Sequence, residues 1–257
     1  MYTEDYYKLQ KNVELPANYK KALTDFMDKI VKLNPLSIIL YGGLARELTA
    51  KEGWSDIDFV VIFTELDISL MIVISDIKKE ITQLTGIDLD INVIEKSELE
   101  NNSILSVKYN AKYMNIFSKR PNISLVLYGK IIDVEYQTKD EKLASIFRIN
   151  DAIFQFRKEL LDGTYLNLDN KSIVGKIRRT NAIVRASLVV MGYYVHPYEG
   201  LIDCLNEILP EYDVEILKYL LSIRNGSTPI DCKELFFKMV DFLEDYLEYF
   251  SFKMGIK

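Results

Sequence analysis

YGGLAR at residues 41–46 and WSDIDF at residues 54–59 are the two segments that decide the fold of this 257-residue chain. An apolar run from Leu36 to Leu40 leads into the first segment. A second apolar run, from Ile57 to Phe63, begins inside the second segment. Apolar runs of this length predict short buried strands. The glycine pair at the end of the first strand permits a tight turn and a close approach of the backbone to a ligand.

Helices and strands are predicted to alternate on both sides of these segments. Apolar residues at helical spacing favour an amphipathic helix over about residues 17–33, which Pro35 ends. A short helix is expected from Leu44 to Ala50, and its first N–H groups would suit phosphate oxygens. A longer helix is expected from Leu70 to Leu84, with Gly86 at its C-terminal end.

A third strand is predicted from Leu89 to Ile94, after the longer helix. Ser97 and Glu100 have the spacing of a capping box, which predicts that another helix follows directly. Residues 123–135 are expected to add one or two short strands around Gly129. Alternating strands and helices indicate a sheet with helices packed against it.

The second half of the chain carries only helical patterns. Helices are predicted over residues 138–163, 171–191, 199–209 and 213–224, and a last one after Asp231. The expected fold class is therefore α+β, with a sheet domain over residues 1–136 and an all-α helical bundle over residues 137–257.

Three carboxylates are the candidate chemical groups. Asp56 and Asp58 are two residues apart, so on a strand they point to the same face. Like charges at this spacing cost stability unless a cation or a proton compensates them, and magnesium is a natural partner. Asp90 lies in the next predicted strand and would join the pair if the two strands were neighbours. Three carboxylates could then hold two metal ions.

These residues resemble the nucleotidyltransferase superfamily related to DNA polymerase beta, and most of all its minimal and aminoglycoside nucleotidyltransferase branch. The family carries Gly-Gly or Gly-Ser, then Asp-x-Asp, then a later Asp on a neighbouring strand. The resemblance covers residues 36–95 and implies a mixed-sheet nucleotidyltransferase catalytic domain. Gly43 departs from the branch, which usually has Ser at that position.

The resemblance also implies a role for each site residue. Asp56 and Asp58 would bind metal and orient the triphosphate, and Asp90 would bind the catalytic metal and help to activate the acceptor. The glycine pair, Gly42 and Gly43, would cradle phosphates. The nucleotide-binding candidates also include Arg46 and Ser55.

The implied activity is a magnesium-dependent transfer of a nucleoside monophosphate from a nucleoside triphosphate (NTP) to an acceptor hydroxyl. Two Mg²⁺ ions are expected, pyrophosphate is released, and the acceptor is a small molecule or a protein. The alternative is an antitoxin-type or regulatory nucleotide-binding protein that acts on a protein partner.

The helical half resembles the helical domain of kanamycin nucleotidyltransferases and the related HEPN bundles. HEPN ribonucleases place a His shortly after an Arg, but no His follows Arg224, and the single His of the chain, His196, is upstream. We therefore expect no HEPN-type ribonuclease activity.

Several site residues have plainer interpretations. Asp56 and Asp58 could be a solvated strand end, and Asp88 rivals Asp90 for the third position. Arg46 could be a solvated helix residue. Basic residues on the helix over 171–191 favour a solvated face over a phosphate contact.

Composition limits the partners. The net charge of −6 disfavours a long nucleic acid as acceptor. The two cysteines form no paired motif, which favours a reducing cytoplasm. The N-terminus shows no signal peptide, and no apolar run reaches the length of a membrane span. The aromatic residues of the last helix predict either core packing or the face of a homodimer.

Overall fold

The computed structural model describes residues 1–50, 55–100, 116–117, 124–130, 132, 138–193, 198–211, 214–224 and 231–256. Contacts divide the chain into two compact units, of which the first comprises residues 1–108 with 113–135 and the second the remainder. The predicted domain boundary after residue 136 falls outside the described residues and stays a prediction. The two units are described separately.

The first unit is built around a four-stranded sheet. Its elements are α1 (Glu4–Lys11), α2 (Ala17–Ile30), η1 (Val31–Leu33), β1 (Ser37–Tyr41), α3 (Gly42–Glu47), β2 (Ile57–Phe63), α4 (Ile68–Thr85), β3 (Leu89–Glu95), α5 (Lys96–Glu100) and β4 (Leu125–Gly129). The strand order is β3-β2-β1-β4. β1 pairs antiparallel with both β2 and β4, whereas β2 and β3 are parallel. The expected mixed sheet is therefore confirmed.

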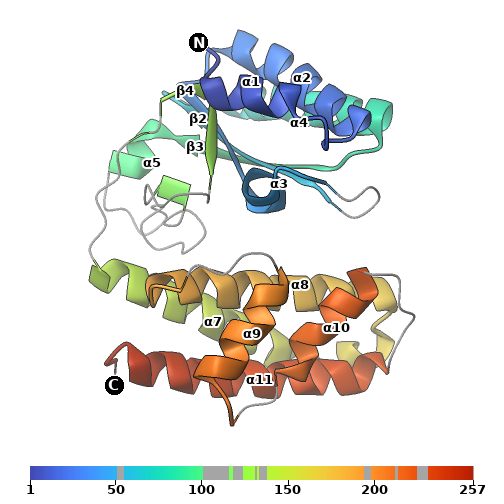
Figure 1. Ribbon diagram of the computed structural model, residues 1–257, viewed down its shortest axis with the longest axis vertical. Helices are drawn as coiled ribbons and strands as arrows, with labels where there is room; N and C mark the ends of the chain where they lie inside the picture. Colours follow the sequence, from blue (N-terminus) through green and yellow to red (C-terminus); the bar gives the residue numbers. More distant parts are fainter. Residues whose placement is uncertain are drawn as a thin grey trace. The chain divides into compact units, whose positions relative to one another are not determined.

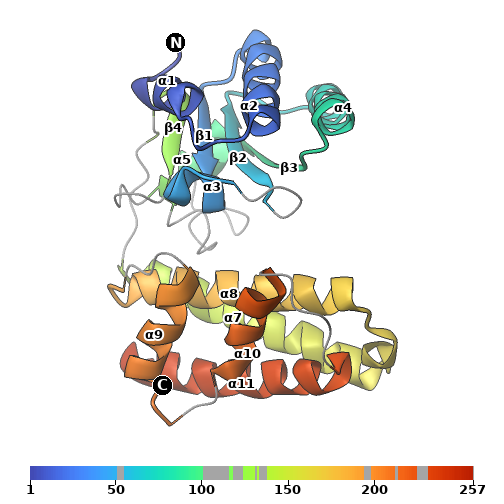
Figure 2. The same cartoon turned by 45° about the vertical axis from the view of Figure 1, so that its right-hand side comes forward.

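Two helices, α2 and α4, cover one face of this sheet (Figures 1 and 2). The alternate residues Ile57, Phe59 and Val61 of β2 belong to the core beneath them, and the ring of Phe59 stacks on that of Phe26. Because strand side chains alternate between faces, the residues between them point to the opposite face. Asp58 therefore points to the face of the sheet opposite α2 and α4.

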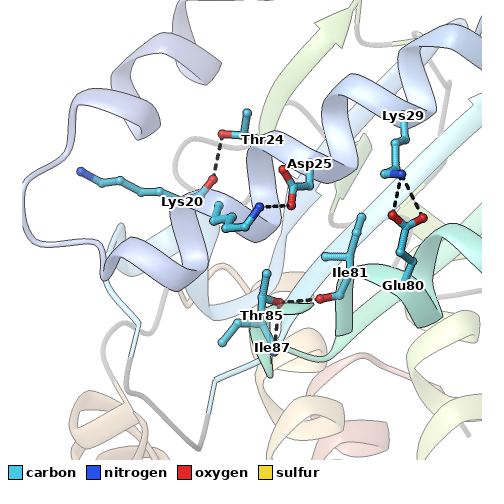
Figure 3. Close-up of polar contacts among 9 residues, drawn as sticks. Lys20, Thr24, Asp25, Lys29, Glu80, Ile81, Thr85 and Ile87 are labelled. Carbon is cyan, nitrogen blue, oxygen red and sulfur yellow. Dashed lines mark hydrogen bonds and ion pairs between the residues drawn. The ribbon is translucent and has the colours of Figure 1, made fainter. Parts of the chain in front are cut away.

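Polar contacts hold the two covering helices in place at their outer surfaces (Figure 3). Lys29 of α2 contacts both carboxylate oxygens of Glu80 on α4 at 2.9 Å. The hydroxyl of Thr85 donates to the carbonyl of Ile81 and accepts from the N–H of Ile87, where α4 turns towards β3. Gly86 ends α4 with a left-handed φ of 71°, as its position predicts.

Two short helices differ from the sequence patterns. The first, α1, was not predicted, because only Tyr6 and Leu9 of its eight residues are buried. The second, α5, follows β3 directly, as predicted, but it begins at Lys96, so the predicted capping box of Ser97 and Glu100 is wrong.

Other bonds fix the start of α5. Glu98 accepts from the N–H of Glu95, and the hydroxyl of Ser97 donates to the Glu95 carboxylate. That hydroxyl and the N–H of Leu66 lower the pKa of Glu95.

The second unit is helical throughout its described residues. Its elements are α7 (Thr138–Leu161), η3 (Thr164–Asn167), α8 (Asn170–Val190), α9 (Tyr198–Ile208), α10 (Glu215–Arg224) and α11 (Cys232–Lys253). Within this unit α7, α8 and α11 lie alongside one another, and α9 and α10 cross them at an angle (Figures 1 and 2). Asp231 caps α11 by accepting from the N–H groups of Lys233 and Glu234. The predicted α+β class, with a helical second half, is confirmed.

None of the helices in the described parts of the chain combines the length and the apolar character that a membrane span needs.

Candidate active site

Three side chains meet in one row across the sheet. Tyr41, the last residue of β1, is in register with Asp58 of β2, which is in register with Asp90 of β3. Residues in register on neighbouring strands point to the same face. Asp58 and Asp90 therefore lie side by side on the face opposite α2 and α4, at the start of their strands, as the sequence led us to expect if the strands paired.

A small hydrogen-bond network holds Asp90. The Tyr41 hydroxyl lies 3.3 Å from Oδ2 of Asp90, and the side-chain amide of Asn92 donates to the Tyr41 hydroxyl at 2.8 Å. The same amide lies 3.4 Å from Oδ1 of Asp90. Sequence reasoning missed Tyr41 and Asn92. The available signal was that Asn92 shares the face of Asp90 two residues further along the strand.

The backbone conformation and the space at position 42 both require a glycine beside these carboxylates. Gly42 opens α3 directly after β1 with a φ of 80°, a conformation that side chains other than glycine's rarely adopt. A methyl group at Gly42 would also overlap the carboxylate of Asp58. Gly43 differs, because a methyl group there would meet no atom within 4 Å. Only Gly42 is thus required by the geometry.

Asp56 and Ser55 lie just before β2. Asp56 is partly buried, and Ile57 beside it donates its N–H to the carbonyl of Asp88 at 3.0 Å. The carbonyl of Ser55 accepts a 2.7 Å hydrogen bond from the hydroxyl of Tyr19, a fully buried residue of α2. This bond ties the entry into β2 to the helix layer.

Asp88 and Asp90 have different surroundings, although they are only two residues apart. The Asp88 carboxylate is 68% exposed and lies 3.4 Å from the ammonium group of Lys78 on α4. Asp90 is partly buried and lies opposite Asp58. The geometry therefore favours Asp90 over its rival as the partner of Asp58.

The donor set suits a hard cation. Among the described residues no three His, Cys, Asp or Glu side chains are gathered closely enough to form a complete metal site. Magnesium does not need one, because it commonly binds one or two carboxylates and completes its shell with water and substrate phosphates. The Asp58–Asp90 pair beside a side-chain-free Gly42 fits this requirement.

The last candidate in this unit is Arg46, which lies in the final turn of α3 and is partly buried. It is therefore not a fully solvated helix residue. Its proposed contact with phosphate stays a prediction.

The helical unit has a pocket of its own between α7, η3 and α8, with a volume of about 560 Å³. Its two cations already have partners, since Lys176 lies 2.6 Å from Glu159 and Arg179 lies 2.9 Å from Asp151. Lys176 also lies over the ring of Phe156. These pairs account for Lys176 and Arg179 without a bound phosphate.

Comparisons with known proteins concern the family and the fold of the chain. Residues 20–143 match the family model of the nucleotidyltransferase domain. Among solved structures, the chain is similar to spectinomycin adenyltransferase AAD(9) from Enterococcus faecialis, crystallised with ATP and spectinomycin. The TM-score is 0.56 at 14% sequence identity, over 87% of this chain and 97% of that one. A search of curated proteins found no match.

Proposed function

We propose that this chain is a nucleotidyltransferase, because its residues 20–143 match the family model of the nucleotidyltransferase domain. The chain transfers a nucleoside monophosphate from a nucleoside triphosphate to an acceptor hydroxyl. The acceptor oxygen attacks the α-phosphorus and forms a new P–O bond, while the bond to the β-phosphate bridging oxygen breaks. Pyrophosphate leaves, and the hydroxyl proton passes to a base.

One observation carries this proposal, namely the pairing of Asp58 with Asp90 in the parallel register of β2 and β3. Two carboxylates on one face repel each other, and a cation that binds both relieves the repulsion. Magnesium, expected as two ions, would be held by Asp58, Asp90 and Asp56 and would neutralise charge on the triphosphate. Asp90 would also lie next to the acceptor hydroxyl and help to remove its proton.

The glycine corner supports the placement of the triphosphate. Gly42 lets the chain turn against the Asp58 carboxylate, and the space beside Gly43 is open, so phosphate oxygens could approach main-chain N–H groups there. Arg46 and Ser55 flank this corner in sequence and are proposed as further nucleotide contacts. Rate enhancement would come from positioning the reactants and neutralising charge, which are the main contributions in phosphoryl transfer.

We assign ATP as the donor and a small hydroxyl-bearing molecule as the acceptor. The structurally similar adenyltransferase was crystallised with ATP and with spectinomycin, which motivates both choices. The acidic chain disfavours a long polyanionic acceptor.

The test is a transfer assay with ATP labelled at the α-phosphate. Purified protein is incubated with Mg²⁺, labelled ATP and a panel of aminocyclitol and aminoglycoside acceptors, and acceptor mass and pyrophosphate are measured. The proposal predicts an acceptor that gains one AMP for each pyrophosphate released, and no product with Asp58→Asn. Label that appears only on a co-purified protein would instead assign a protein acceptor. Absence of transfer to every acceptor, with each of the four common triphosphates, would contradict the proposed reaction.

A further inference from the structure

We propose that Tyr41 and Asn92 are positioning residues that fix the carboxylate of Asp90 for cation binding. The inference rests on the proposed function, since it assigns work to two side chains around a carboxylate of that site. Neither side chain is a candidate metal ligand in this account. Both act through Asp90.

Tyr41 reaches Asp90 from a strand that is not its neighbour. The sheet order places β2 between β1 and β3, and adjacent strands lie about 4.8 Å apart. The Tyr41 side chain therefore has to cross β2 to bring its hydroxyl to 3.3 Å from Oδ2 of Asp90. Tyr41 is only 4% exposed, and its bond to Asp90 is partly buried. The Tyr41 side chain therefore connects β1 to β3 across β2.

Asn92 sets the direction of the Tyr41 hydroxyl. Its amide nitrogen can only donate, and it donates to the Tyr41 oxygen at 2.8 Å. The hydroxyl hydrogen of Tyr41 is then available to Asp90, which as a carboxylate only accepts. The Asn92 amide also lies 3.4 Å from the other carboxylate oxygen. Each oxygen of Asp90 consequently has a donor beside it.

This arrangement suits a metal-binding carboxylate. A carboxylate offers about four lone-pair sites, so the donors from Tyr41 and Asn92 do not by themselves use up its acceptor capacity. The donors also restrict rotation of the Asp90 side chain, so less conformational entropy is lost when the cation binds. Groups that orient a metal-binding carboxylate typically contribute a factor of about 10 to 100 in metal affinity or activity.

The test measures Mn²⁺ binding by electron paramagnetic resonance in the presence of a non-hydrolysable ATP analogue, so that no turnover is needed. Tyr41→Phe, which removes a single oxygen atom, is expected to weaken Mn²⁺ binding roughly tenfold. Asn92→Ala is expected to weaken it by a similar factor. Tyr128→Phe is the matched control, because Tyr128 packs against the core on the helix side of the sheet, and its Mn²⁺ affinity should equal that of the wild type.

The Asp90→Asn variant distinguishes an effect of Tyr41 through Asp90 from a merely structural role of Tyr41. If Tyr41 acts through the carboxylate, Tyr41→Phe should cause no further loss of Mn²⁺ affinity there, whereas a general loss of structure would add to the first effect. If Asn92→Ala does not fold, Tyr41→Phe decides alone. Unchanged Mn²⁺ affinity in Tyr41→Phe, alongside weak binding by Asp90→Asn, would overturn the inference and leave the proposed function intact. No Mn²⁺ binding by the wild type would overturn both.

Discussion

At the scale of single residues, the proposed site consists of a glycine and a pair of carboxylates that the sequence already indicated. The two-residue spacing of Asp56 and Asp58 could be recognised without coordinates. The pairing of Asp58 with Asp90 could be predicted only on the condition that the two strands were neighbours. The bond between Tyr41 and Asn92 could not be predicted, because it depends on the sheet order and register, which long-range contacts set.

Replacing Gly42 tests the close approach at the glycine corner. Gly42→Ala is expected to lower the free energy of unfolding by at least about 1–2 kcal/mol because of its left-handed φ, and to displace Asp58. Transfer activity should fall to background. The control is Gly86→Ala, which has a similar φ of 71° and open space around a new methyl group. It should lose stability and keep its activity. Full activity in Gly42→Ala, measured together with denaturant unfolding, would contradict the proposed contact.

Asp90 and Asp88 provide a matched pair of substitutions two residues apart. Asp90→Asn is expected to reduce kcat by roughly 100-fold or more, in the range seen when one group that stabilises a transition state is removed. Asp88→Asn makes the same chemical change at an exposed carboxylate that contacts Lys78. It should alter kcat by less than about twofold, because exposed ion pairs contribute little. Equal losses in the two variants would argue that neither carboxylate has the role proposed for Asp90.

At the scale of elements, strongly apolar runs and long amphipathic patterns were sufficient to predict β2, β3, α2 and α4. The short α1 escaped because its helix is largely polar and is held by contacts far away in sequence. The N–H of Thr3 donates to the carbonyl of Leu127 on β4, and the ring of Tyr2 contacts that of Tyr128. Local sequence cannot reveal such partners.

The bond between α2 and the entry into β2 leads to a prediction about element positioning. Tyr19→Phe leaves the carbonyl of Ser55 without this buried donor, which should cost about 1–3 kcal/mol of stability. Because Asp56 follows Ser55 directly, the KM for the triphosphate should also rise. Thermal unfolding and steady-state kinetics of the variant check both effects. Unchanged stability would show that the bond contributes nothing.

The last helix, α11, carries an acidic run that should weaken the helical unit at neutral pH. Burial and the neighbours Asp241, Glu248 and Glu244 raise the pKa of Asp245. A raised pKa in the folded state means that protonation favours folding, so this contribution is present below the ordinary pKa and is lost as the pH rises through the folded value.

Asp245→Asn should therefore stabilise the protein at pH 7. The expected gain is about 0.2–0.5 kcal/mol, the usual size of a like-charge interaction on a helix. The difference from the wild type should shrink as the pH falls towards 4. Unfolding curves of both proteins across this pH range provide the measurement, and a gain that grows on acidification would contradict the assignment.

At the scale of the whole molecule, the change from alternating strands and helices to helices alone predicted the α+β class. The structural match to the adenyltransferase covers most of both chains, so that protein also combines a sheet unit with a helical unit. What the sequence could not supply is the acceptor, because acceptor choice depends on the shape of a surface assembled from distant residues.

We propose that the carboxylates of β2 and β3 bind a metal–triphosphate complex. Calorimetric titration of ATP with Mg²⁺ into the wild type and into Asp56→Asn/Asp58→Asn tests it most directly. We expect a saturable heat for the wild type that requires Mg²⁺ and is absent from the double variant. Equal binding of ATP by the two proteins, or binding by the wild type that does not depend on Mg²⁺, would contradict it.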